Sequence, residues 1–156
     1  MSKTGGGRAN KSGNTLEQMG EAFLVSHGYA KSPNRNYGIH TVEKKPVYFR
    51  QLNIGQTIYD TSLNVYFFVC SPTKHKKGLI IECKWQQSGG SIDEKYPYLV
   101  QNLLKTKETS LVVLDGGGYK PGAKAWLKAQ EEKHAKLSVH DLRVLSVGEI
   151  TAVFNS

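Results

Sequence analysis

The hydrophobic positions of this 156-residue chain predict an alternation of helices and strands that begins with a helix. From residue 15 to 27 apolar side chains recur at helical spacing. Asn14 and Thr15 each precede an acidic or amide residue by three positions, the arrangement of a capping box. Gly28 is suited to the C-terminal cap, because glycine adopts the left-handed conformation found there.

The next apolar segments are typical of strands. Two β-branched and aromatic runs, Val47–Leu52 and Asn64–Cys70, predict strands at the edge and then in the middle of a sheet. The apolar run LIIECKW follows the second of them, separated from it by the polar stretch SPTKHKKG. This order predicts a hairpin, because the intervening stretch has proline, glycine and charge but little to bury.

The second half of the chain repeats helix and strand patterns. Ser91 and Glu94 form another capping pattern, SLVVLDGGG reads as a buried strand and its turn, and Pro121 opens a further helix. A last strand is expected at Leu142–Leu145 and a closing helix at Glu149–Phe154. The order of elements predicts an α/β fold with a mixed sheet covered on both faces.

The length of the chain fits one domain with an adequate core. Residues 1–14 are rich in Gly, Ser and Lys, which predicts a flexible basic arm ahead of a domain spanning 15–156. No apolar segment follows the first basic residues and no run is long enough for a membrane span, so we expect an intracellular protein without a membrane partner. Cys70 and Cys83 lie in apolar runs without paired spacing, which favours two reduced core thiols.

The net charge of +8 and the pI of about 9.5 favour a polyanionic partner, with nucleic acid first. The alternative is that the lysines only keep the protein soluble. The basic residues that we expect to contact DNA are Arg8 and Lys11 in the arm, Lys74, Lys76 and Lys77 in the hairpin loop, and Lys95. The histidines are scattered and lack metal-ligand spacing, which argues against a zinc enzyme.

One strand carries unusual polar residues. Alternate side chains of a strand share a face, so Glu82, Lys84 and Gln86 project together from LIIECKWQ. An acid and an amine in an apolar strand are costly unless they are paired or bind something. Phosphodiester hydrolysis uses this combination, because carboxylates hold a hard cation and a lysine stabilises charge on the phosphate. The alternative is a structural ion pair on a half-exposed strand.

Longer motifs support the catalytic interpretation. The segments IIECKWQQSGGSIDEKYPYLVQNL and LVVLDGGGYKPGAKAWL, together with the opening GGGRANKSGNTLE, resemble a branch of the PD-(D/E)XK nucleases related to restriction endonucleases. The matches cover a large part of the chain in the same order. The resemblance is therefore more specific than an E-x-K tripeptide.

The resemblance implies a restriction-endonuclease-like fold, with three α/β/α layers and a central mixed β-sheet. It also implies DNA cleavage dependent on Mg²⁺, with Mn²⁺ as a substitute. Glu82 would be a metal ligand, Lys84 would orient water or stabilise charge, and Gln86 would line the site. Glu17 or Glu21 of the first helix would complete the metal shell; the alternative is that both are solvated acids.

The remaining ligand departs from the family pattern. Relatives place an Asp just before an apolar strand, whereas here Asn64, Val65 and Tyr66 enter that run. Asp60, in GQTIYDTSL, is the acid that we expect to serve as the ligand. If Asp60 is an ordinary turn residue, the chain would be a weakened or inactive nuclease that still binds DNA.

The sequence thus predicts a Mg²⁺-dependent DNA endonuclease, with restriction or homing-type cleavage ahead of junction resolution or DNA repair. One domain holds one site, so cutting both strands of double-stranded DNA would be simplest for a homodimer. The alternative is a catalytically inactive DNA-binding module of the same fold.

Overall fold

The strands lie in the sheet in the order in which they occur in the chain, β1-β2-β3-β4-β5-β6. The computed structural model describes residues 16–33, 45–86, 89 and 92–141. Its elements are the N-terminal helix (residues 16–26), β1 (Ala30–Lys31), β2 (Val47–Gln56), β3 (Ser62–Cys70), β4 (Leu79–Trp85), α2 (Ile92–Lys105), β5 (Thr109–Asp115), α3 (Pro121–Lys133) and β6 (Leu137–Asp141).

The sheet is mixed. β2, β3 and β4 pair in antiparallel fashion, whereas β1 is parallel to β2, and β5 is parallel to both β4 and β6. The parallel pairs β4–β5 and β5–β6 need crossover connections of helical length, which α2 and α3 provide. The predicted hairpin is confirmed by the pairing of β3 with β4.

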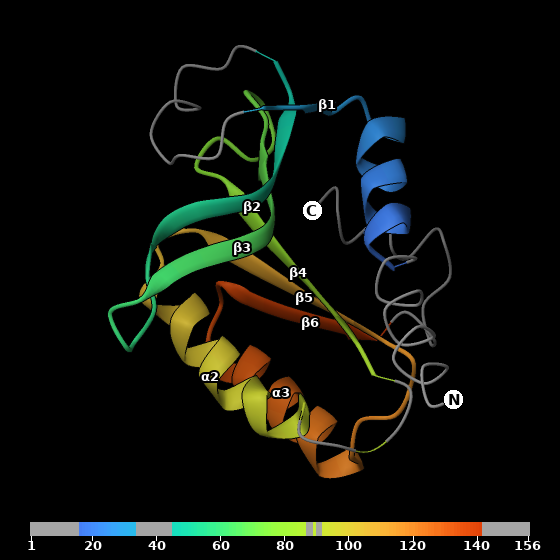
Figure 1. Cartoon of the computed structure of the whole chain (residues 1–156), viewed down its shortest axis with the longest axis vertical. Helices are drawn as coiled ribbons and strands as arrows, with labels where there is room; N and C mark the ends of the chain where they lie inside the picture. The colour runs from blue at the N-terminus through green and yellow to red at the C-terminus, as the bar shows by residue number, and fades with distance from the viewer. Residues whose placement is uncertain (1–15, 34–44, 87–88, 90–91, 142–156) are drawn as a thin grey trace, which may run out of the picture.

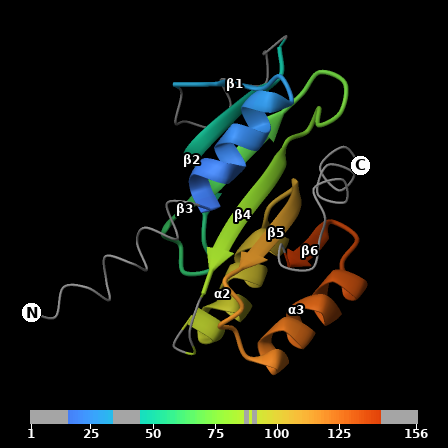
Figure 2. The ribbon, with the colours of Figure 1, turned by 90° about the vertical axis from the view of Figure 1, so that its right-hand side faces the viewer.

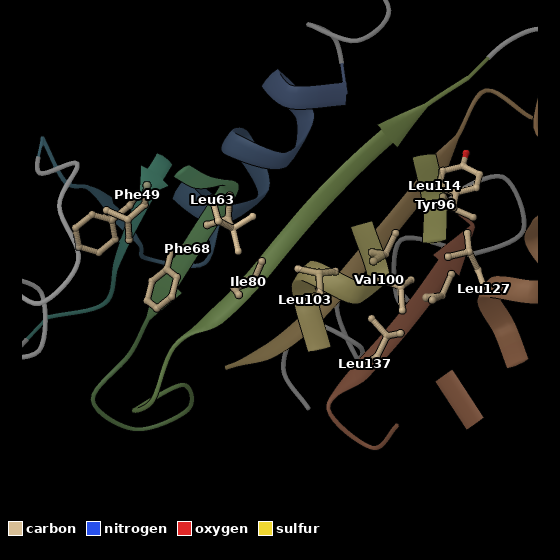
Figure 3. Close-up of a cluster of buried hydrophobic side chains, with 14 of the residues drawn as sticks. Phe49, Leu63, Phe68, Ile80, Tyr96, Val100, Leu103, Leu114, Leu127 and Leu137 are labelled. Atoms are coloured by element: carbon tan, nitrogen blue, oxygen red, sulfur yellow. The ribbon is translucent and has the colours of Figure 1, made fainter. Parts of the chain in front are cut away.

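Helices cover both faces of the sheet. Figures 1 and 2 show α2 and α3 side by side on one face and the N-terminal helix on the other. The larger core lies under α2 and α3, and Figure 3 shows side chains from β2 to β6 meeting both helices there. A second buried cluster packs Leu16 and Leu24 against Tyr48, Phe67 and Ile81. The predicted three-layer α/β/α fold is therefore confirmed.

Two features of the sheet differ from the sequence prediction. β2 is not an edge strand, because the short β1 pairs with Val47 and Tyr48. The second difference is a strand at Leu137–Asp141, which the sequence analysis did not predict. Leu137 and Val139 are buried and the residue that follows each of them is half-buried, and this alternation in the sequence would have indicated a strand. Three other predictions lie outside the described residues: the last strand at 142–145, the closing helix at 149–154 and the basic arm at 1–14.

The regular alternation of side chains between the two faces of the sheet is interrupted near the middle of β3. Tyr66 and Phe67 are neighbours, yet both pack with the cluster under the N-terminal helix, whereas Val65 and Phe68 belong to the larger core. On β2, Gln51 has a φ of 50° beside this point. The pairing of β3 with β4 runs from Val69–Leu79 to Phe67–Ile81, and beyond it Figure 1 shows β3 curving away from β4. The sheet thus separates at Tyr66 and Glu82.

In the described part of the chain, no helix has the length and apolar character needed to span a membrane. The two cysteines in this part, Cys70 and Cys83, are free thiols, as the sequence predicted.

Gly78, which ends the loop between β3 and β4, has a φ of 94°, and a Cβ there would overlap the ring of Phe68. Gly28 has a similar φ of 86° but open space at its Cβ position. We expect Gly28→Ala to lower the free energy of unfolding by about 1–2 kcal/mol, from backbone strain alone. Gly78→Ala should cost about 1–3 kcal/mol more, from overpacking. Urea unfolding followed by circular dichroism measures both, and equal losses would contradict the role of the Phe68 contact.

Candidate active site

Glu82 and Lys84 lie on β4 just after its last pair with β3. The carboxylate of Glu82 is buried, with 6% of the residue exposed. Its Oε1 accepts a hydrogen bond of 2.9 Å from the backbone N–H of Tyr66, and its Oε2 lies 3.9 Å from Nζ of Lys84. The predicted acid and amine are therefore brought together at the separation of the two strands.

Burial raises the pKa of Glu82, and the nearby Lys84 ammonium and the Tyr66 N–H counteract this rise. Because burial disfavours the charged form, this carboxylate gains from any further positive charge placed beside it. Burial also raises the pKa of the neighbouring Cys83 thiol to about 12, with Glu82 as the second cause. Cys83 is therefore not poised as a nucleophile.

Tyr66 links Glu82 to the N-terminal helix. Its backbone N–H binds Glu82, and its hydroxyl donates a 3.1 Å hydrogen bond to Oε2 of Glu17. Burial raises the pKa of Tyr66, so the hydroxyl stays protonated as a donor. Glu17 is also ion-paired with the guanidinium of Arg50 on β2. One residue thus contacts two carboxylates that are far apart in the sequence, Glu82 with its backbone and Glu17 with its hydroxyl.

Glu21 occupies a different place on the same helix. Its carboxylate accepts a 2.8 Å hydrogen bond from the Tyr48 hydroxyl and lies 3.4 Å from both Lys31 and Arg50. The sequence offered Glu17 or Glu21 as the additional acid, and the contact with Tyr66 is made by Glu17. Neither Tyr66 nor Arg50 was predicted, although a charged Arg50 inside the apolar run VYFRQL was a usable signal.

Gln86 stabilises the end of β4. Its side-chain oxygen accepts a 3.1 Å hydrogen bond from the Tyr96 hydroxyl of α2, and only 2% of the residue is exposed. Its backbone bonds Asp115 and Gly118, and a Cβ at Gly116 would collide with this backbone. Gln86 thus joins β4 to α2 and to the loop after β5. These contacts fix the end of the strand that carries Lys84.

Asp60 lies in the turn between β2 and β3, with a φ of 59° and its N–H bonded to the carbonyl of Thr57. This turn is held on the C-terminal half of α2, where Asn102 accepts the N–H of Ile58 and Lys105 bonds the Thr57 carbonyl. The end of β4 instead meets Tyr96, near the start of α2. These contacts place Asp60 in a turn against α2, whereas Glu82 lies where β3 and β4 separate.

The predicted DNA contacts fall in three places. Lys74, Lys76 and Lys77 are exposed on the loop between β3 and β4, and Lys95 is exposed near the start of α2. Arg8 and Lys11 lie outside the described residues.

The described residues fit a divalent cation at one carboxylate. Among residues 16–33, 45–86, 89 and 92–141, no three His, Cys, Asp or Glu side chains form a group that would hold a metal ion. Mg²⁺, however, is often bound through one or two carboxylates, with water and substrate phosphate as the other ligands. Glu82 suits such a carboxylate, and the hydrogen bonds of Tyr66 connect it to Glu17.

The raised pKa of Glu82 predicts how its replacement changes stability with pH. A carboxyl group whose pKa rises on folding contributes stability below its unfolded pKa, near 4.5, and this contribution is lost as the pH rises through the folded pKa. Glutamine does not titrate, so the Glu82→Gln variant does not lose this stability as the pH rises. The free energy of unfolding of the variant minus that of the wild type should therefore increase from pH 4 to pH 8. Urea unfolding at the two pH values measures it; a difference that does not change with pH would contradict the burial argument.

Comparison with known proteins gives one family. The protein-family model for the PD-(D/E)XK nuclease superfamily domain matches residues 8–156 of the chain. The match includes Glu17, Glu82 and Lys84 as well as every strand of the sheet. No curated protein and no solved structure matches the chain.

Proposed function

Because the chain belongs to the PD-(D/E)XK nuclease superfamily, we propose that it is a Mg²⁺-dependent endonuclease that hydrolyses phosphodiester bonds of double-stranded DNA. Membership in the superfamily implies a nuclease with a nucleic-acid substrate and, in general, a divalent metal ion. The observation that carries the finer proposal is the pairing of buried Glu82 with Lys84 where β3 and β4 separate.

Each group around Glu82 has a distinct part in this reaction. Glu82 would hold a Mg²⁺ or Mn²⁺ ion, which when bound would supply charge neutralisation at the phosphate and activation of water. The Tyr66 N–H fixes the orientation of the Glu82 carboxylate. The Lys84 ammonium orients the attacking water and stabilises the charge that develops on the phosphate oxygens.

We place the second carboxylate at Glu17. Tyr66 holds Glu17 with its hydroxyl and Glu82 with its backbone, so both acids belong to one hydrogen-bonded group. Asp60, in contrast, lies in a turn that packs on α2 through Asn102, Lys105 and the stacked rings of Tyr59 and Tyr98. Release of Glu17 from Arg50 would free an oxygen for the cation.

Restriction or homing-type cleavage at a defined sequence is the role that we propose for this activity. One domain with one site cuts both strands most simply as a homodimer with two-fold symmetry, because each protomer then addresses one strand.

A second candidate is a nuclease fold that binds DNA without cutting it. The observation that favours it is the position of Asp60 together with the absence, among the described residues, of a three-member acidic group. The net charge of +8 would serve DNA binding in either case.

The two candidates differ in a plasmid assay. With Mg²⁺ we expect nicking or linearisation that EDTA abolishes and that Lys84→Ala reduces about 100-fold or more, as for removal of a group that stabilises transition-state charge. Lys133→Ala, which removes an exposed lysine at the end of α3, is the matched control and should cleave at the wild-type rate. DNA binding without cleavage by the wild type would support the binding module and contradict the enzyme.

The second carboxylate is tested by the Mg²⁺ concentration that gives half-maximal cleavage. Glu17→Gln should raise this concentration about tenfold or more, a typical cost of weakening a metal site. Glu21→Gln, on the same helix and on the same Arg50, should leave it nearly unchanged. Asp60→Asn should also leave this Mg²⁺ concentration nearly unchanged. A large increase in the Asp60 variant alone would return the ligand role to Asp60.

A further inference from the structure

A pocket of about 750 Å³ lies at the start of β4, away from Glu82 and Lys84. We call it the basic pocket. It is formed by the loop between β3 and β4, the first residues of β4 and β5, part of β6 and one residue of α3. Its lining residues are Thr73, Lys74, His75, Lys76, Lys77, Gly78, Leu79, Thr109, Ser110, Leu111, Glu131, Ser138 and His140.

The charge of the basic pocket favours an anion. Three lysines line it against a single carboxylate, Glu131. That carboxylate is already engaged, because it accepts the backbone N–H of Val139 at 2.8 Å and lies 3.3 Å from Nζ of Lys128. The hydroxyls of Thr73, Thr109 and Ser138 add hydrogen-bond donors to the lining. Lysine ammonium groups and hydroxyls are donors that suit phosphate oxygens.

The loop that carries the lysines is held in place before any ligand binds. The hydroxyl of Ser71 accepts the N–H groups of Thr73 and Lys74, and the backbone of His75 bonds both Ser71 and Gly78. Gly78 packs directly on the ring of Phe68. A loop fixed in this way loses little conformational entropy when it binds.

The position of the basic pocket relative to Glu82 suits a long polyanion. Leu79 lines the basic pocket and Lys84 belongs to the candidate active site. The five residue steps along β4 between them span roughly 16 Å. Successive phosphates of one DNA strand advance about 3.4 Å along the axis, so this distance is about five nucleotides.

We propose that the basic pocket binds a backbone phosphate of the DNA substrate and anchors the duplex about five nucleotides from the bond that is cleaved. This rests on the proposed function, since it assigns to the same substrate a second contact. The volume accommodates the phosphate together with an adjoining sugar.

His140 provides a reporter inside the basic pocket. Burial and the charge of Lys128 lower the pKa of His140, and Glu131 acts in the opposite direction. The other charged or titratable groups of the lining are Lys74, His75, Lys76 and Lys77 on the loop. A phosphate among these groups favours the protonated ring, so binding should raise the pKa of His140.

The first experiment measures duplex binding by fluorescence anisotropy in EDTA, where no metal-dependent cleavage occurs, with the full chain. Lys76→Gln/Lys77→Gln should weaken binding about tenfold and lower the slope of log affinity against log salt by about 0.9 per lysine. Lys120→Gln/Lys133→Gln removes the same charge from exposed ends of α3 outside the pocket lining and should have a much smaller effect. Equal effects of the two double variants would overturn the proposal.

The second experiment needs no variant. NMR titrations of the His140 ring with a short duplex and with inorganic phosphate should both raise its pKa, while the ring signals of His134, outside the pocket lining, stay in place. A response to phosphate but not to the duplex would overturn the DNA anchor and leave a site for a small phosphate-bearing molecule. No response to either would overturn the anion site itself.

The two proposals can fail separately. If the wild type cleaves plasmid and the Lys76→Gln/Lys77→Gln variant binds and cleaves equally well, the basic pocket proposal is wrong and the nuclease proposal stands. If the wild type neither binds nor cleaves DNA, the proposed function is wrong and the anchor falls with it.

Discussion

The candidate site depends on the hydrogen bond between the Tyr66 backbone N–H and the Glu82 carboxylate. β3 and β4 stop pairing at Phe67 and Ile81, which would leave a buried backbone donor without a partner at the next position of β3. Glu82 takes the place of the missing strand carbonyl. The same contact that completes the sheet therefore brings a carboxylate into the gap between the strands, next to Lys84.

This arrangement has an energetic cost that its surroundings offset only in part. Burial raises the pKa of Glu82, and a single lysine at 3.9 Å and one N–H oppose that effect. A buried carboxylate in this state favours a nearby cation, which is the property that a metal-dependent nuclease requires. Tyr66 extends the group to Glu17 on the N-terminal helix, so the two layers of the fold meet at the site.

β4 connects two regions of different charge. Its far end, beyond Glu82 and Lys84, is fixed by the bonds of Gln86 to α2 and to the loop after β5. Its near end begins at Gly78, where the ring of Phe68 fixes the path of the lysine-bearing loop. A central strand is the most rigid element available in a sheet. The distance between the candidate active site and the basic pocket is therefore set by β4 and not by flexible segments.

The sequence alone determined the order of most helices and strands, the mixed sheet and the placement of Glu82 and Lys84 on one strand. These features depend on local periodicity and turn residues, which lie close together in the chain. The tertiary structure decided which acid is connected to Glu82 by hydrogen bonds through Tyr66. The change of face at Tyr66, the curvature that moves Asp60 to α2 and the contact of Glu17 with Tyr66 all depend on packing between distant segments. No local pattern records that packing, because side chains from different elements are brought together only by folding.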